Sequence, residues 1–239
     1  MTIPAIATTP TEWDEPSGLA PRGTVVVLTG RGETPASYQR FGRRLAADAY
    51  RVRVVEVDLD DVASARAAVA ALLSDTPEPR VLVGSDTGAT LAASLAGELD
   101  LVDGVVLAGL ALPGSARDGD WDDELEARTA CPTHRRILSE DTGFTRGALA
   151  RPVPSGWSLR VPAKPVLVLH GSADPVTAAA AAFEPFRGVP TARLREISGG
   201  RHDVLNDVSH RAVAANVVLF LESLRLGRDL PAIVVDVQG

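Results

Sequence analysis

Short apolar runs alternate with alanine-rich segments along most of this 239-residue chain, and this alternation limits the folds open to it. Runs such as Thr24–Leu28 and Arg80–Val83 are almost wholly apolar after their first residue, as expected of parallel strands buried on both faces. The segments between them have the composition of crossover helices. The pattern predicts an α/β architecture, a mostly parallel sheet with helices on both faces.

The predicted elements follow in chain order. Strands are predicted at Thr24–Leu28, Val52–Val57, Arg80–Val83, Gly104–Ala108, Val166–His170 and Ala192–Ile197. Helices are predicted at Tyr38–Asp48, Val62–Leu73, Ala89–Leu99, Asp122–Arg128, Val176–Phe186 and Asp207–Leu224. The first twenty residues form either an arm or short edge strands, and residues 231–235 form either one more strand or an arm.

The alternation stops between residues 113 and 162, where Gly, Pro, charged residues and two tryptophans are scattered. This segment follows several strand–helix units, and ligands of open α/β sheets bind at the carboxyl ends of the strands. We therefore expect residues 113–162 to form a cap inserted over that edge. Residues 1–112 and 163–239 then form the core of a single domain.

The composition of the chain limits its expected binding partners and its expected cellular compartment. The net charge of -7 argues against nucleic acid as a partner, and the single cysteine, Cys131, excludes an intrachain disulfide and a cysteine metal cluster. The start of the chain lacks the features of a signal peptide, and no apolar stretch approaches the roughly 18 residues of a membrane span. We expect a cytoplasmic protein with no membrane partner; its oligomeric state is open, and a homodimer is one option.

The segment Gly84-Ser85-Asp86-Thr87-Gly88 joins a predicted strand to a predicted helix. Its pattern, a glycine two residues before and two after a central residue, is that of a tight turn that holds a nucleophile at its tip. Asp86 occupies the tip. Two other interpretations stay open: an ordinary loop in which Asp86 caps the helix, and a nucleophilic Ser85, for which the glycines are out of frame.

Two polar residues follow later strands at their carboxyl ends. Asp174 comes after the strand at Val166–His170, and His202 comes after the strand at Ala192–Ile197. A nucleophile followed by an acid and then a histidine is the order of one kind of catalytic triad, in which the acid orients the histidine and the histidine acts as base. The alternatives are that Asp174 only begins a helix and that His202 is a surface residue.

Several of these segments resemble the monoacylglycerol lipase and lysophospholipase branch of the α/β-hydrolase superfamily. The segments that carry the resemblance are Leu28-Thr29-Gly30-Arg31-Gly32-Glu33 followed by Tyr38, the turn at Asp86, His170-Gly171-Ser172-Ala173-Asp174, and Arg201-His202-Asp203-Val204-Leu205-Asn206-Asp207. The similarity covers roughly residues 22 to 112 and 163 to 225. It implies an α/β-hydrolase fold with a short cap.

The resemblance also implies roles for five residues. Asp86 would be the nucleophile, Asp174 the acid and His202 the base, while the backbone N–H groups of Arg31 and Thr87 would form the oxyanion hole. The sequence departs from that branch in two places: the turn has Ser-Asp where the family has His-Ser, and a threonine replaces the histidine before the oxyanion glycine.

An aspartate at the turn favours displacement at a saturated carbon, because its attack on an ester would give a high-energy anhydride. The product is an alkyl-enzyme ester, which His202 and water can then hydrolyse. The turn resembles that of haloalkane dehalogenases and epoxide hydrolases. However, Thr87 stands where dehalogenases have Trp, and Tyr38 and Tyr50 both lie outside the cap.

We therefore predict an enzyme that hydrolyses a small apolar organic molecule, of epoxide or halide type, through Asp86, His202 and Asp174. One alternative is a cofactor-independent lyase, dehydratase or cyclase of secondary metabolism that uses Asp86 and His202 as acid and base. Another is a ligand-binding protein without catalysis. No cofactor or metal is expected, and His170 and His210 are interpreted as structural. The predicted substrate-binding residues of the cap are Trp121, His134 and Trp157.

Overall fold

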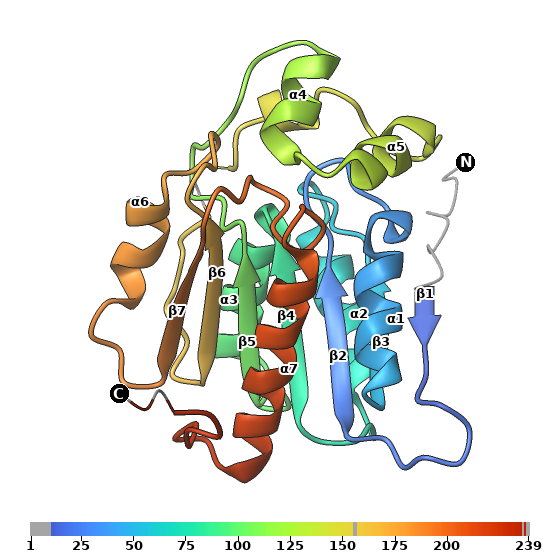
Figure 1. Ribbon diagram of the computed structural model, residues 1–239, viewed down its shortest axis with the longest axis vertical. Helices are drawn as coiled ribbons and strands as arrows, with labels where there is room; N and C mark the ends of the chain where they lie inside the picture. Colours follow the sequence, from blue (N-terminus) through green and yellow to red (C-terminus); the bar gives the residue numbers. More distant parts are fainter. Residues whose placement is uncertain (1–10, 155–156, 236, 238–239) are drawn as a thin grey trace.

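The computed structural model describes residues 11–154, 157–235 and 237, and a seven-stranded sheet forms its centre (Figure 1). From one edge to the other the strands are β1 (Thr11–Trp13), β3 (Tyr50–Val55), β2 (Gly23–Leu28), β4 (Arg80–Ser85), β5 (Gly104–Ala108), β6 (Val166–Gly171) and β7 (Ala192–Ile197). The edge strand β1 is antiparallel to β3, and all other pairings are parallel. The mostly parallel sheet predicted from the alternation is confirmed.

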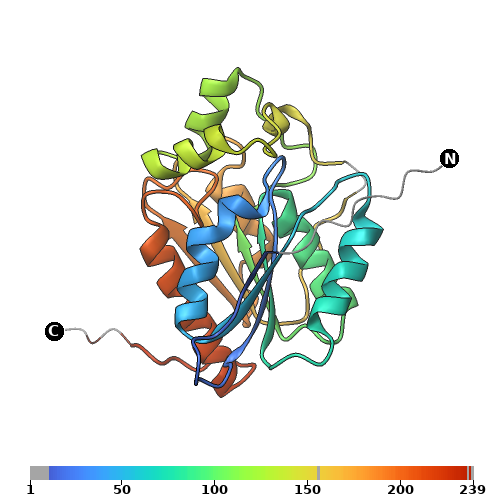
Figure 2. The ribbon, with the colours of Figure 1, turned by 90° about the vertical axis from the view of Figure 1, so that its right-hand side faces the viewer.

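Helices cover both faces of this sheet, as Figures 1 and 2 show. On one face lie α1 (Gln39–Ala47) and α7 (His210–Leu226), and on the other lie α2 (Val62–Leu73), α3 (Thr87–Glu98) and α6 (Ala179–Phe183). Successive side chains of a strand point to opposite faces. In β2, Val25 and Val27 accordingly pack with the first pair of helices, while Val26 and Leu28 pack with the second group.

Most predicted boundaries lie within two or three residues of the observed ones, and two of the differences have a clear physical reason. Pro185 lacks a backbone N–H, so α6 ends at Phe183 and a short 3-10 helix, η3 (Glu184–Phe186), follows it. Asp207 lies before α7 because its carboxylate accepts hydrogen bonds from Thr129 and from the backbone of Arg201. The tail at 231–235 forms no strand in the structure.

The described part of residues 113–162 contains two α-helices and a short 3-10 helix, namely α4 (Trp121–Arg128), α5 (Pro132–Glu140) and η2 (Ala148–Ala150). These elements lie over the carboxyl ends of the strands (Figure 1). The sequence predicted α4 but missed α5, which begins at a proline and whose residues are mostly polar. The function of this segment as a cap stays a prediction.

The helices of the described residues can be compared with what a membrane span requires. None of the helices in the described ranges combines the length and the apolar character that a bilayer crossing requires.

Candidate functional site

Asp86 lies at the tip of the turn between β4 and α3, with a φ of 52° and a ψ of -120°. A positive φ is rare for a residue with a Cβ, and such strain is typical of functional turns. The turn needs glycine on both sides. A Cβ on Gly84 would lie 2.2 Å from the carbonyl oxygen of Gly88, and one on Gly88 would lie 2.3 Å from that of Leu28. The Asp86 side chain makes no capping hydrogen bond to α3, which contradicts the helix-cap interpretation.

The three predicted catalytic side chains meet beneath residues 113–162. The Nε2 atom of His202 lies 3.0 Å from Oδ1 of Asp86, and its Nδ1 lies 2.8 Å from Oδ2 of Asp174. His202 and the side chains of both acids are fully buried. Asp174 is held from its other side, because its Oδ1 accepts the backbone N–H groups of Val176 and Thr177. The geometry is that of a nucleophile, a base and an orienting acid; their catalytic roles stay predictions.

His170 adds a contact to this arrangement. Its Nε2 lies 2.9 Å from Oδ2 of Asp174 and 2.8 Å from the carbonyl oxygen of Thr177. The ring thereby fixes the loop that carries Asp174, which agrees with a structural role for His170.

The side chain of Arg31 closes the site, and the sequence did not predict this. The Nε and Nη2 atoms of Arg31 lie 2.8 Å from Oδ2 and Oδ1 of Asp86, a two-pronged ion pair with no exposed side-chain surface on the acid. The backbone N–H of Arg31 also donates to Oδ2 of Asp86, over 2.8 Å. This N–H is the predicted oxyanion donor, so the Asp86 oxygen itself occupies that position. The available signal was a cationic residue at the oxyanion position together with an acid at the turn.

Residues 113–162 hold the same guanidinium from above. Its Nη1 donates to the carbonyl oxygens of Ser115, Leu149 and Arg151, over 3.0, 3.4 and 2.6 Å. Arg31 thus joins the nucleophile position of the core to the segment that covers it.

Thr87 and Ser85 are placed differently from Arg31. Thr87 is not among the donors to the Asp86 carboxylate in the described part of the chain, and its buried Oγ1 has no hydrogen-bond partner there. Its role in the oxyanion hole stays a prediction. Ser85 is buried on β4 next to Tyr38, and it is Asp86, not Ser85, that contacts His202. This arrangement disfavours Ser85 as the nucleophile.

The charges of the site stabilise one another. Burial alone would raise the pKa of Asp86, but the Arg31 charge and the hydrogen bonds from His202 and Arg31 hold it well below its usual value. Burial would lower the pKa of His202, yet the Asp174 and Asp86 carboxylates raise it to about 10. The pKa of Asp174 is lowered in turn, against burial, by His202 and His170. Asp86 is therefore an anion and His202 a cation at neutral pH.

A second group of buried polar residues lies beside the first. One ligand atom from each of Glu33, His134 and Asp203 falls within 4.8 Å of the others, a spacing that can hold a metal ion. The guanidinium of Arg128 already provides a cation there, 3.3 Å from Glu33 and 3.6 Å from Asp203. We therefore regard this group as an internal ion-pair network that ties α4 to the core.

The pKa values of this network reflect its burial. Burial and the Asp203 charge raise the pKa of Glu33 to about 8, although Arg128 opposes them. Burial lowers the pKa of His134 to about 4. Glu33 is thus mostly protonated and His134 neutral at pH 7, so the network holds fewer charges than its residue types suggest.

The other predicted substrate-binding residues lie apart from the Asp86 carboxylate. Trp121 packs against Phe144, with ring centroids 5.4 Å apart, and under the guanidinium of Arg146. Trp157 is half-buried against the hydrophobic cluster on the α2 and α3 face of the sheet. Neither residue, nor His134, lines the two cavities described for this chain. Substrate binding by these three side chains stays a prediction.

The larger of these cavities, about 1060 Å³, lies next to the site. It is lined by the end of β3 and the loop after it, by α2 and by residues between 143 and 151, with Arg31, Gly32 and Glu33 among its lining residues. Its wall is apolar along α2, at Ala65 and Ala68. Asp86 does not line it, although Arg31 contacts both the cavity and Asp86. The Arg31 side chain therefore separates the cavity from the acid.

Comparison with known proteins gives matches to solved structures alone. No family model matches the chain. No curated protein sequence matches it either.

Three matched structures are a monoacylglycerol lipase of Paleococcus ferrophilus, a soluble variant of the monoglyceride lipase of Saccharomyces cerevisiae in complex with a substrate analogue, and an esterase of a Rhodococcus species. Their identities to this chain are 19%, 15% and 21%, and their TM-scores are 0.69, 0.72 and 0.66. Each match covers 90% of this chain and, respectively, 98%, 91% and 99% of the other. At these identities the matches establish the fold.

Proposed function

We propose that this chain, which has the α/β-hydrolase fold, hydrolyses a small, largely apolar organic substrate through an alkyl ester on Asp86. The observation that carries this proposal is the unequal setting of the two Asp86 oxygens. Oδ2 accepts the backbone N–H of Arg31, and Oδ1 faces His202. One oxygen thus accepts the N–H that we predict as an oxyanion donor, and the other is the candidate for attack on carbon.

In the first step Oδ1 attacks a saturated carbon, and the bond from that carbon to its leaving group breaks. The leaving group departs with the electron pair, and Asp86 becomes a neutral ester. A halide or an epoxide oxygen suits this step. The loss of the Asp86 charge removes one of the two carboxylates that raise the pKa of His202, so the imidazolium can release its proton to the departing anion or to water.

In the second step neutral His202 takes a proton from water, and the oxygen of that water attacks Cγ of Asp86. Negative charge develops on Oδ2, where the Arg31 N–H already donates. The bond from Cγ to Oδ1 then breaks, and the product alcohol takes the proton from His202. Asp86 then gives the second proton of that water to His202, which restores the Asp86 carboxylate and the His202 cation, and Asp86 carries one oxygen from water.

Arg31 must release Oδ1 before attack, because its Nη2 now donates to that oxygen. Since Arg31 also borders the 1060 Å³ cavity, a substrate that enters there meets the guanidinium first. The displaced cation would lie next to the reacting carbon, where it can stabilise the departing anion. Arg31 would thereby stabilise the leaving group. The sequence has no tryptophan after Asp86 and no tyrosine in residues 113–162 that could do so instead.

The lyase alternative fits the charges less well. A general base works best with a pKa near the pH of the reaction, whereas the pKa of Asp86 lies well below its usual value. A carboxylate that remains ionised suits nucleophilic attack better than proton transfer.

Ligand binding without turnover is a second candidate, and one observation favours it. The Asp86 carboxylate is fully buried and already accepts hydrogen bonds from Arg31 and His202. In this arrangement, which we call the closed state, neither oxygen is free for attack. A protein that keeps this state would bind a molecule in the cavity and return it unchanged.

Single-turnover reaction in heavy-oxygen water tests the first proposal, with haloalkanes and epoxides as the substrate panel. Covalent hydrolysis places one heavy oxygen in Asp86 and leaves the first alcohol unlabelled, because that alcohol keeps the oxygen of the protein. Direct attack of water on the substrate would give labelled alcohol and unlabelled Asp86, and that outcome refutes the mechanism.

His202→Gln should stop the second step and accumulate an adduct on Asp86, visible by intact-protein mass. Asp86→Asn should abolish the adduct, and Ser85→Ala, which changes the neighbouring hydroxyl, should leave it unchanged. Saturable binding of a panel compound with no adduct and no product would favour the binding protein instead.

A further inference from the structure

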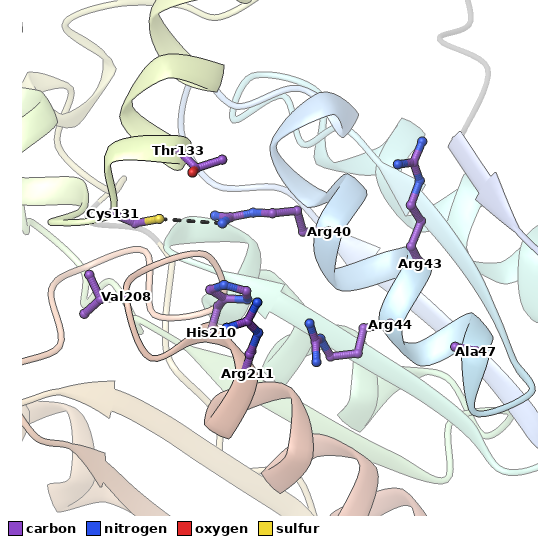
Figure 3. A pocket seen from close by; sticks show the side chains of 9 residues that line it. All are labelled: Arg40, Arg43, Arg44, Ala47, Cys131, Thr133, Val208, His210 and Arg211. Carbon is purple, nitrogen blue, oxygen red and sulfur yellow. Dashed lines mark hydrogen bonds between the residues drawn. The ribbon is translucent and has the colours of Figure 1, made fainter.

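A second cavity, an open hollow of about 760 Å³, lies between α1, the start of α5 and the start of α7 (Figure 3). Its lining residues are Arg40, Arg43, Arg44, Ala47, Cys131, Thr133, Val208, His210 and Arg211. The first four lie at helical spacing, so one face of α1 supplies them. We call this hollow the arginine hollow.

Its charge is unusual for this chain. Four arginines line the arginine hollow, no acidic residue lines it, and none of the four has an ion pair in the described part of the chain. The whole chain nevertheless has a net charge of -7. Elsewhere the arginines are commonly paired, as Arg66 is with Glu98 and Arg135 with Glu126. Like charges on one helix face and its neighbour repel each other unless an anion lies between them.

Arg40, one of the lining residues, has a side-chain N–H without an acceptor in the described part of the chain. Its Nη2 donates to the carbonyl oxygen of Asn206 over 2.7 Å, and its Nη1 lies 3.6 Å from Sγ of Cys131. Its Nε is buried and lacks a hydrogen-bond partner in the described structure. A buried N–H without an acceptor is unfavourable, and an anion bound in the hollow would stabilise the Arg40 guanidinium through its charge.

Two of the other three arginines are directed into the same space. Figure 3 shows the side chains of Arg44 and Arg211 directed toward each other across the gap between α1 and α7, with His210 beside Arg211, while Arg43 points away. Burial, followed by the charges of Arg40, Arg44 and Arg211, lowers the pKa of His210, as expected in a positive field. The 17-residue helix α7 also begins here, and the positive end of its dipole favours an anion.

We propose that the arginine hollow binds a small soluble molecule with at least two adjacent phosphate groups, such as a diphosphate ester. Arg40, Arg44 and Arg211 supply the charge, and two adjacent phosphates match three cations better than one phosphate does. The volume fits a small ligand. Val208, which is 55% exposed at the rim, offers an apolar contact to the organic part.

Titration calorimetry with inorganic pyrophosphate, and with ATP as a diphosphate-containing ester, tests this proposal. The doubly substituted Arg44→Gln, Arg211→Gln protein should bind both probes at least about tenfold more weakly than the wild type. Arg195→Gln, at an exposed position on β7, is the matched control and should bind as the wild type does. Inorganic phosphate should bind more weakly than pyrophosphate, and added salt should weaken all binding.

Folding and the source of the phosphate are checked separately. The double variant should melt at the same temperature as the wild type or higher, because it removes two like charges from partly exposed positions. Equal pyrophosphate binding by the wild type and the double variant would overturn the proposal. So would binding to vesicles of phosphatidylglycerol without binding to pyrophosphate or ATP, which would indicate a membrane surface. Asp86→Asn should keep the phosphate binding, since the site is independent of the proposed hydrolysis.

Discussion

At the scale of single residues, Arg31 places a full positive charge against Asp86, and both side chains are almost wholly buried. Removing two charges from water is expensive, and their attraction compensates only when geometry and further hydrogen bonds are good. Here the Nη1 group of Arg31, which does not contact Asp86, donates to backbone carbonyl oxygens of residues 113–162. The stability of the closed state therefore depends on both members of the pair.

Replacing Arg31 by Met should reduce the free energy of unfolding by about 3–5 kcal/mol, because Asp86 is left as a buried charge with one partner fewer. Urea denaturation at pH 7 measures this. Arg66→Met removes the partner of Glu98 in an exposed ion pair and should cost no more than about 1 kcal/mol. Similar losses in both variants would mean that the Arg31 pair contributes no more than a surface pair.

Glu33 gives a prediction that depends on pH. Its pKa of about 8 in the folded chain exceeds the ordinary value of 4.5, so the unfolded chain loses this proton at lower pH than the folded chain does. Stability should fall as the pH rises from 4.5 to 8. Glu33→Gln, which stays neutral, should reduce this dependence and stabilise the chain at pH 7.

The measurement is the free energy of unfolding between pH 5 and pH 8 in wild type and variant. Glu78→Gln, at an exposed position, is the control and should follow the wild type. A Glu33→Gln protein whose stability falls as steeply as that of the wild type would show that Glu33 holds no proton in the folded chain.

The candidate site was predictable in part from the sequence. Asp86, Asp174 and His202 could be found because each follows a recognisable strand, and a parallel sheet brings such positions to one edge. The Arg31 side chain could not, because its direction depends on carbonyl groups of Ser115, Leu149 and Arg151, far away in the sequence. The charge-free Glu33 and His134 could not either, since their protonation depends on burial that only the packed structure defines.

At the scale of elements, the turn that carries Asp86 depends on the closeness of α3 to β2. Gly88 permits this approach, because a Cβ there would lie 2.3 Å from the carbonyl oxygen of Leu28. Further along the same helix, a Cβ on Gly97 would meet nothing within 4 Å. The two glycines of α3 thus form a matched pair for a test.

Gly88→Ala should lower the free energy of unfolding by at least about 3 kcal/mol, since backbone atoms must move to admit the methyl group. Gly97→Ala should change stability by between zero and a gain of about 1 kcal/mol, because alanine favours the helix. Thermal and urea denaturation of both variants measure this. If Gly88→Ala were as stable as the wild type, the close contact of α3 and β2 could not be as described.

Elements with a regular pattern of apolar residues were the easiest to predict from the sequence. β5 and β7 matched their predicted bounds because their apolar or alternating runs are bounded by clear breaks, and α2 matched because its N-cap, Asp61, precedes an unbroken alanine-rich run. Helix α5 was missed because its residues are largely polar and only His134 and Leu138 are buried. Its position depends on the Glu33 and Asp203 network beneath it, which no local pattern reveals.

At the scale of the whole molecule, stability should depend on the charge of His202. Its folded pKa of about 10 lies above the ordinary 6.5, so the stabilisation is complete below pH 6.5 and is lost as the pH rises toward 10. The free-energy difference between wild type and His202→Gln should therefore shrink across that range. Comparing the two proteins at each pH cancels the other groups, and a difference independent of pH would contradict a charged His202.

The chain of charges from Arg31 through Asp86 and His202 to Asp174 alternates in sign and sums to zero. An exchange of Asp86 for serine would delete one negative charge and leave the Arg31 guanidinium buried against a neutral hydroxyl. A second change, at Arg31 itself, would have to accompany it. A one-residue mutational path between this site and a serine hydrolase therefore passes through a destabilised protein, so the two positions are expected to change together over evolutionary time.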